Sequence, residues 1–374
     1  MSSVPRTIVC AGGGGVGKTT TSAALGVALA RRGARTLVVT VDPARRLASA
    51  MGIDIDADVH PAHVEAAVEG NLFALMPEPR RSTGTFIDLL FDDQPEAKER
   101  MLANRVYMLL ADAAAGMHEV VSVMLVAKAI QERAYDYLII DTAPSRQGLD
   151  FVAYPGRLAS LYEGRAVGWL ASLARRSEGN EDEEDVRDSG GGLLAIGRRR
   201  VEALFGRLVS PRVLRELAGL FAELLLVKDR FARLARVAED LLLGEQTRYL
   251  LVAAPSGSAA ADVRFLAKRL KRLGHQPTAL VLNRADQGSP AWIEGLGDGD
   301  ELPEALRGAL ATVAEEFDIR RQAGDDLASG LRKDLPGVPA VRLPTLEARD
   351  PSRIVRGLAT LLGDHLPLLA GTPG

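Results

Sequence analysis

Residues 7–33 read TIVCAGGGGVGKTTTSAALGVALARRG, and this stretch decides the fold. Thr7–Ala11 is a short apolar run typical of a buried strand, and a glycine cluster follows it directly. Residues 18–32 then have a helical pattern, which Gly33 closes where a left-handed cap is favoured. Gly12–Thr19, GGGGVGKT, fits the pattern G-x-x-x-x-G-K-[ST] between a strand and a helix. The stretch therefore predicts a phosphate-binding P-loop.

The loop predicts a separate role for its backbone and for each of its polar side chains. We expect Lys18 to bridge the β- and γ-phosphates, Thr19 to bind Mg²⁺ directly through its hydroxyl, and Thr20 to reach the α-phosphate. The positive end of the following helix adds to the attraction for phosphate. The residues whose backbone N–H groups are expected to cradle phosphate oxygens are Gly13, Gly14, Gly15, Val16 and Gly17.

Further apolar runs alternate with helical patterns along the chain. The runs are continuous rather than alternating, which suits parallel strands buried on both faces. Strands that alternate with helices predict an α/β fold with a doubly wound, mostly parallel sheet. The runs lie at residues 35–41, 71–76, 137–140, 249–253, 278–282 and 341–343.

The middle of the chain has a helical pattern with no convincing strand. We expect residues 1–154 to form the P-loop and switch half of a nucleotide-binding domain and residues 155–246 to form a helical insertion. Within the insertion, residues 178–192 are acidic, end in three glycines and read as a solvated loop. Residues 247–374 are expected to complete the nucleotide-binding domain with its base-binding loops.

Composition excludes several classes of protein. The formal net charge of −3 argues against a surface built for nucleic acid. The single cysteine, Cys10, can form neither an internal disulfide nor a CxxC metal clamp, so the chain reads as cytoplasmic and Cys10 as a small buried apolar residue. No apolar run approaches the roughly 18–20 residues that span a bilayer, so we expect any membrane contact to be indirect.

Two acidic residues follow strands at the edge where α/β proteins bind ligands. Asp42 ends the run 35–41, where it could hold a water in line with the γ-phosphate. Asp141 ends the run 137–140, and its natural role is support of Mg²⁺ through water. Asp42 is likewise expected to contact the metal only through water. Each residue alone could equally be a turn or helix cap, but together with the P-loop they predict phosphoryl chemistry.

Longer motifs around these acids resemble one family. Asp42-Pro43-Ala44, with Arg45-Arg46-Leu47 after it, and Asp141-Thr142-Ala143-Pro144-Ser145 resemble the two switch loops of the arsenical-pump ATPases and of their relatives that target tail-anchored membrane proteins. The segment Gly116–Glu119 is similar to a Gly/Glu segment between those switches. The family has a deviant Walker A motif and shares a larger class with the Min and Par positioning ATPases. The resemblance covers residues 7 to about 155 and resumes from Tyr249 to the C-terminal helix.

The resemblance implies more than the residues alone establish. It makes Asp42 the water-positioning residue of switch I and Asp141 the first residue of switch II. It implies that Asn283 hydrogen-bonds adenine and that Leu343 and Pro344 pack near the base. ATP would be the substrate and Mg²⁺ the cofactor. Members dimerise face to face across two nucleotides, closing with ATP and opening after hydrolysis.

The sequence departs from the family at three points. Gly13 stands where the family's P-loop, KGGVGKT, has a second lysine that reaches the partner's phosphates. We therefore expect either a heterodimer with a lysine-bearing paralogue or a homodimer in which Arg45 and Arg46 are the trans donors. The lone cysteine removes the CxxC zinc site of the targeting members, so a zinc-free, bacterial-type member is expected. One cysteine and one P-loop also speak against an arsenite role.

Several alternatives remain open from the sequence. Asn283-Arg284-Ala285-Asp286 approximates the guanine-reading motif N-K-x-D, although Asp286 could also be a simple turn acid. The helical residues 213–243 could line an apolar groove for a protein client or could pack their stripe on the core. The leading function is a Mg-ATP-driven chaperone or targeting switch with a protein client or membrane-complex partner. The alternatives are a Min- or Par-like positioning ATPase on membrane or DNA and a small-molecule ligase or kinase.

Overall fold

The chain contains two compact units. The computed structural model describes residues 5–41, 46–51, 62–64, 71–77, 79–108, 117–132, 134–143, 149, 152, 211–287, 303–346, 348 and 350–371. The first unit comprises residues 1–82, 122–153 and 238–374, and the second comprises residues 83–121 and 154–237. The acidic loop 178–192 lies outside the described residues.

The first unit is built on an eight-stranded sheet with the order β3-β4-β2-β5-β1-β6-β7-β8. All strand pairs are parallel except β3 with β4. The predicted doubly wound, mostly parallel α/β sheet is confirmed, and each predicted run forms a strand within two residues of its expected ends. The strands are β1 (Arg6–Gly12), β2 (Thr36–Thr40), β3 (Ala62–His63), β4 (Leu72–Leu75), β5 (Tyr137–Asp141), β6 (Arg248–Ala253), β7 (Ala279–Leu282) and β8 (Ala340–Arg342).

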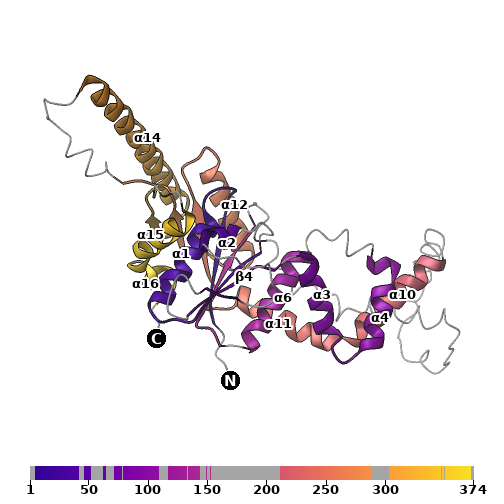
Figure 1. Ribbon diagram of the computed structural model, residues 1–374. Coiled ribbons are helices and arrows are strands. Elements are labelled where there is room, and N and C mark those ends of the chain that lie inside the picture. The colour runs from indigo at the N-terminus through magenta and orange to yellow at the C-terminus, as the bar shows by residue number, and fades with distance from the viewer. Residues whose placement is uncertain are drawn as a thin grey trace. The chain divides into compact units, whose positions relative to one another are not determined.

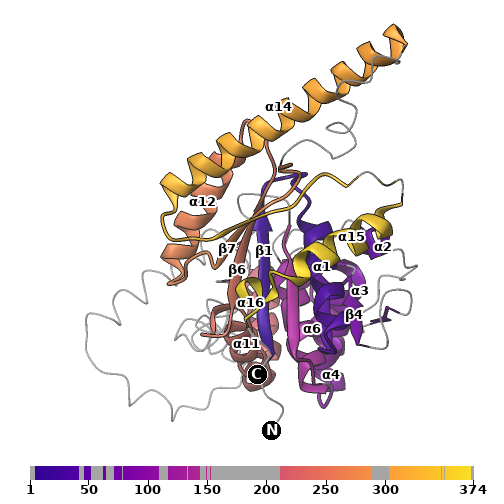
Figure 2. The same cartoon turned by 90° about the vertical axis from the view of Figure 1, so that its left-hand side faces the viewer.

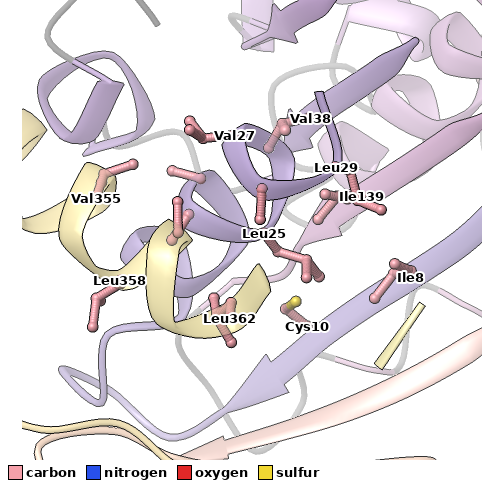
Figure 3. Packing of buried hydrophobic residues seen from close by; sticks show 14 of the residues in the cluster. Ile8, Cys10, Leu25, Val27, Leu29, Val38, Ile139, Val355, Leu358 and Leu362 are labelled. Atoms are coloured by element: carbon pink, nitrogen blue, oxygen red, sulfur yellow. The ribbon is translucent and has the colours of Figure 1, made fainter. Parts of the chain in front are cut away.

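Helices α1 (Lys18–Arg31) and α15 (Pro351–Gly363) pack together on one face of this sheet (Figure 3). Side chains alternate along a strand, so Ile8 and Cys10 of β1 share this face, and both are fully buried. Gly26 lets α1 lie close to the sheet, because a Cβ there would come within 2.5 Å of Val38 Cγ2. Gly33 ends the helix with a φ of 85°, which confirms the predicted left-handed cap.

The remaining helices of the first unit enclose the sheet and extend past it. Helix α12 (Ala259–Arg272) packs on β6 and β1 and buries Val263, Leu266 and Leu270. Helix α14 (Glu304–Asp334) extends beyond the strands in both views (Figures 1 and 2), and its buried residues all lie in its C-terminal half. The unit also contains α2 (Arg46–Met51), most of α6 (Met117–Glu132) and α16 (Leu366–Leu369).

Cys10 behaves as a structural residue. Its side chain is fully buried in β1, and burial raises the pKa of its thiol to about 12. A thiol with such a pKa is almost wholly protonated near neutral pH and is a poor nucleophile. The prediction that Cys10 is a small buried apolar residue is confirmed.

Polar contacts link two helices of the second unit. Arg100 of α4 (Pro95–Ala103) donates to both carboxylate oxygens of Glu223 in α10 (Pro211–Leu226). Asn104 Nδ2 donates to the Glu216 carbonyl at 2.6 Å, which fixes the end of α4 beside α10. The unit also contains most of α3 (Pro79–Leu90) and of α11 (Lys228–Leu243).

The apolar residues between 213 and 243 divide into two groups. In α11, Phe231 and Leu234 are buried, and so are Leu241 and Leu242. In α10, Phe221, Leu224 and Leu225 are partly exposed, and Leu226 is 55% exposed. These apolar residues of α11 are therefore buried, whereas those of α10 are partly exposed or exposed.

Candidate nucleotide site

The site begins at the N-terminus of α1, directly after β1. Gly15 and Gly17 have φ angles of 70° and 90°, a left-handed conformation that glycine adopts without a steric penalty. Gly17 caps the helix without a side-chain hydrogen bond, so the first backbone N–H groups of α1 are left for a ligand. Lys18 is only 5% exposed and its Nζ donates to the Gly13 carbonyl at 2.7 Å. The arrangement is that of an anion-binding helix terminus.

Two glycines of the loop leave no room for a side chain. A Cβ on Gly12 would lie 2.2 Å from the Val252 carbonyl oxygen of the neighbouring strand. A Cβ on Gly17 would lie 2.1 Å from Asn283 Nδ2. The course of the loop is therefore set by contact with β6 on one side and with the segment after β7 on the other.

Gly17→Ala is expected to weaken nucleotide binding by on the order of 10-fold to 100-fold, because a non-glycine residue held in this left-handed conformation costs about 1–3 kcal/mol. The new methyl group meets Asn283 and is strained by the φ of 90°. Gly15→Ala, with a φ of 70° but open space around its Cβ, reports strain alone. Gly257→Ala, in open space, is the control. Affinities for ADP measured by calorimetry should be highest for Gly257→Ala, lower for Gly15→Ala and lowest for Gly17→Ala. Equal affinities would contradict the explanation from strain and contact with Asn283.

The acidic part of the site lies at the carboxyl ends of three adjacent strands. Asp141 is paired in register with Cys10 of β1 and with Thr40 of β2. Its buried Oδ2 accepts hydrogen bonds from Thr19 Oγ1 at 2.6 Å and from Thr40 Oγ1 at 3.1 Å. The structure thus brings the hydroxyl of Thr19 in the P-loop into direct contact with the carboxylate of Asp141, which the sequence predicts to support Mg²⁺.

The residues expected to contact the base lie in the segments after β7 and β8. Asn283 is buried, and its Nδ2 donates to the Val16 carbonyl at 3.0 Å. Arg284 has a φ of 53°, rare for a non-glycine residue, and its guanidinium donates to the Gly15 carbonyl. Leu343 is fully buried and accepts from the Ala285 N–H at 2.9 Å, while Pro344 follows it partly exposed.

Some expected site residues lie outside this description. Asp42 and Arg45 fall outside the described residues, as do Pro144 and Ser145 of the second switch motif. Arg46 begins α2, but its side chain is not described. The side chains of the segment 116–119 are not described either. The catalytic role of Asp42 and the trans roles of Arg45 and Arg46 remain predictions.

Sequence reasoning missed two residues that contact the site. Thr40 was read only as part of an apolar strand, since threonine is common in strands. Arg284 was considered only within the guanine-type motif, although a basic residue directly after Asn283 was the available signal for a P-loop contact.

The oxygen donors gathered here suit a hard cation. A threonine hydroxyl and a carboxylate are the kind of ligands that Mg²⁺ takes in nucleotide sites, and Thr19 and Asp141 bring them within 2.6 Å of each other. Among the described residues, no group of three or more His, Cys, Asp or Glu side chains could hold a metal ion by itself. Of the helices that the structure describes, none has both the length and the apolar character to cross a bilayer.

Comparison with known proteins agrees with this geometry. Residues 5–179 match the family model described as anion-transporting ATPase. A protein of Aquifex aeolicus named as an arsenical pump-driving ATPase is 33% identical over 160 residues, which are 40% of this chain and 38% of that protein. The ATPase get3 of Aspergillus niger is 31% identical over 212 residues, 55% of this chain and 57% of the relative. The ATPase get3 of Aspergillus terreus is 32% identical over 155 residues, 40% and 43% of the two chains.

The matches thus span between about two fifths and three fifths of these relatives. The family-model match at residues 5–179 includes the P-loop and the first two strands, where the sequence pattern and the geometry are most specific. Residues 5–179 of this chain are therefore similar to the anion-transporting ATPase family.

Proposed function

We propose that this chain is a Mg²⁺-dependent ATPase and works as a dimeric switch in the cytoplasm, coupling closure around ATP to binding of a protein client or membrane-complex partner. The observation that carries the proposal is the contact of Thr19 Oγ1 with Asp141 Oδ2 at 2.6 Å, beside the helix N-terminus that Lys18 begins. Names of relatives such as ATPase get3 support the choice of ATP.

The division of labour follows from the groups present. The N–H groups of residues 13–17 and the Lys18 ammonium would hold phosphate oxygens. Thr19 would bind Mg²⁺ through its hydroxyl, and Asp141 would support the metal through water. The metal supplies charge that offsets the negative charge of the phosphates. Asp42, after β2, orients the attacking water in this proposal. Phosphoryl transfer requires mainly such positioning and electrostatic stabilisation.

The pairing of subunits is suggested by the surroundings of Gly13. A Cβ at this position would lie 2.7 Å from Asp262 Oδ2 of α12. A lysine here would have to displace that carboxylate, and its ammonium would meet a negative charge within its own subunit. The cation therefore comes from the partner, either from a lysine-bearing paralogue or from Arg45 and Arg46 of a second copy.

The second unit offers a surface for a client. Leu102 and Met108 are 43% and 46% exposed, and Val213 at the start of α10 is 42% exposed. Their segments lie side by side, because Asn104 contacts the Glu216 carbonyl (Figure 1). Exposed apolar side chains on neighbouring helices are a feature of many interaction sites. A protein client is favoured over nucleic acid, given the net charge of −3.

The test uses the purified full chain. Phosphate release is measured with ATP in Mg²⁺ and in EDTA, and the mass is measured by light scattering with a non-hydrolysable ATP analogue. Mg²⁺-dependent release and a doubled mass support a homodimer, which makes Arg45 and Arg46 the next residues to mutate. A monomeric mass with proven analogue binding indicates the paralogous partner. Absence of both nucleotide binding and hydrolysis would overturn the proposal. Nucleotide-dependent pelleting with lipid or DNA would favour the positioning-ATPase alternative.

A further inference from the structure

Asp286, three residues after Asn283, has a buried carboxylate with both oxygens engaged. The residue is 5% exposed. Its Oδ1 accepts from the Thr345 backbone N–H at 2.6 Å, and its Oδ2 accepts from Thr345 Oγ1 at 2.8 Å. Hydrogen bonds to a charged acceptor are stronger than those between neutral groups. The carboxylate therefore fastens the segment after β8 to the segment after β7.

The main chain of the two segments is tied together as well. Arg342, the last residue of β8, donates from Nη2 to the Asp286 carbonyl at 2.8 Å and from Nε to the Ala285 carbonyl at 3.3 Å. The Ala285 N–H in turn donates to the Leu343 carbonyl. Side-chain and backbone bonds thus act on the same few residues, and together they fix the wall that flanks Asn283.

Helix α14 supports this wall from behind. Gly324 lies so close that a Cβ on it would be 3.3 Å from Ala285 Cα and 2.8 Å from Arg342 Nη2. The next residue, Asp325, accepts from Arg342 Nη1, and this bond holds the pKa of Asp325 below its ordinary value. The Arg342 guanidinium is thereby fixed in place, and its bonds to the 285–286 backbone are preorganised.

These contacts bear on the choice of base. A guanine-reading aspartate in an N-K-x-D motif accepts hydrogen bonds from the base, which requires a carboxylate that the base can reach, whereas Asp286 is only 5% exposed. Adenine has no N–H donor at its N1 and C2 positions, where guanine carries the N1–H and N2–H₂ groups that such an aspartate accepts from. We propose that Asp286 is a positioning and specificity residue: it fastens the 343–345 segment to the 283–286 segment and withholds its carboxylate from the base, so that the site selects adenine over guanine. The proposal rests on the proposed nucleotide site.

The test compares equilibrium binding of ADP and GDP, measured by calorimetry on the full chain. Thr345→Val removes only the hydroxyl donor and is expected to weaken ADP binding about 5-fold and to narrow the preference for ADP over GDP about 10-fold. Thr345→Ser should restore both values. Asp286→Ala should weaken ADP binding about 10-fold without strengthening GDP binding. Thr312→Val, on the exposed part of α14, should match the wild type.

Two kinetic readouts separate positioning from catalysis. In Thr345→Val, KM for ATP should rise while kcat is retained, because Lys18 and Asp141 are untouched. Melting curves show whether Asp286→Ala is folded. If it is not, the comparison of Thr345→Val with Thr345→Ser still tests the proposal. Unchanged affinities in both Thr345→Val and Asp286→Ala would overturn the proposed role of Asp286 but not the proposed nucleotide site. Loss of GDP but not ADP binding in Asp286→Ala would identify Asp286 as a guanine reader. Wild-type protein that binds neither nucleotide would overturn the proposed site itself.

Discussion

Lys18→Ala is expected to lower kcat/KM for ATP by about 10²–10³-fold, the usual effect of removing one group that stabilises transition-state charge. Lys18 begins α1 and is only 5% exposed, so its ammonium is held at the helix terminus rather than free to sample solvent. Its present bond to the Gly13 carbonyl shows that Nζ already lies against the loop that would hold phosphates. Phosphate release under saturating Mg²⁺ measures the effect.

Two companion variants make this experiment specific. Lys268→Ala removes an exposed lysine of α12 and should leave activity unchanged. Lys18→Arg keeps the positive charge, but residue 18 is only 5% exposed and the planar guanidinium does not fit the enclosed space of the lysine side chain. We therefore expect Lys18→Arg to lower kcat/KM for ATP nearly as much as Lys18→Ala. Activity of Lys18→Ala within a few-fold of the wild type would contradict the assignment of this loop.

Seven of the eight strands of the sheet could be predicted because each of the seven has its own apolar run in the sequence. Continuous apolar runs such as 137–140 and 249–253 are long enough to be recognised, and burial on both faces explains their composition. The two-residue strand β3 has no comparable pattern, and its antiparallel pairing depends on β4. The inclusion of residues 83–121 in the second unit also depends on tertiary contacts, such as that of Arg100 with Glu223, which no local pattern encodes.

The site could be predicted where a residue type suited to nucleotide chemistry directly follows a predicted strand. Gly12–Thr19 and Asp141 were found because few other structures require those residues after a strand. The sequence alone does not distinguish whether Asp286 reads guanine or is a simple turn acid. Its contacts with Thr345 involve a residue 59 positions away, so only the fold could reveal them. Thr40 is a similar case, since its contact with Asp141 follows from the pairing of β2 with β5.

Asp141→Asn is expected to raise the Mg²⁺ concentration needed for half-maximal hydrolysis by about 10–100-fold, the usual effect of changing a residue that supports a metal ligand. Asp141 is fully buried and accepts from Thr19, the expected direct ligand of Mg²⁺. Asparagine keeps the shape and one oxygen acceptor but removes the negative charge. The P-loop and Thr40 remain in place, so ADP binding without Mg²⁺ should change by no more than about 3-fold.

The same substitution separates function from stability. Burial of a carboxylate is costly, and a neutral amide of similar size lowers that cost. The melting temperature of nucleotide-free Asp141→Asn should therefore equal or exceed that of the wild type, as is common where an active site is not optimised for stability. Asp364→Asn, an exposed residue at the end of α15, should change neither the Mg²⁺ requirement nor the melting temperature. A lowered melting temperature with an unchanged Mg²⁺ requirement would mean that Asp141 serves the fold alone. A raised Mg²⁺ requirement in a fully stable protein would place the carboxylate in the metal site.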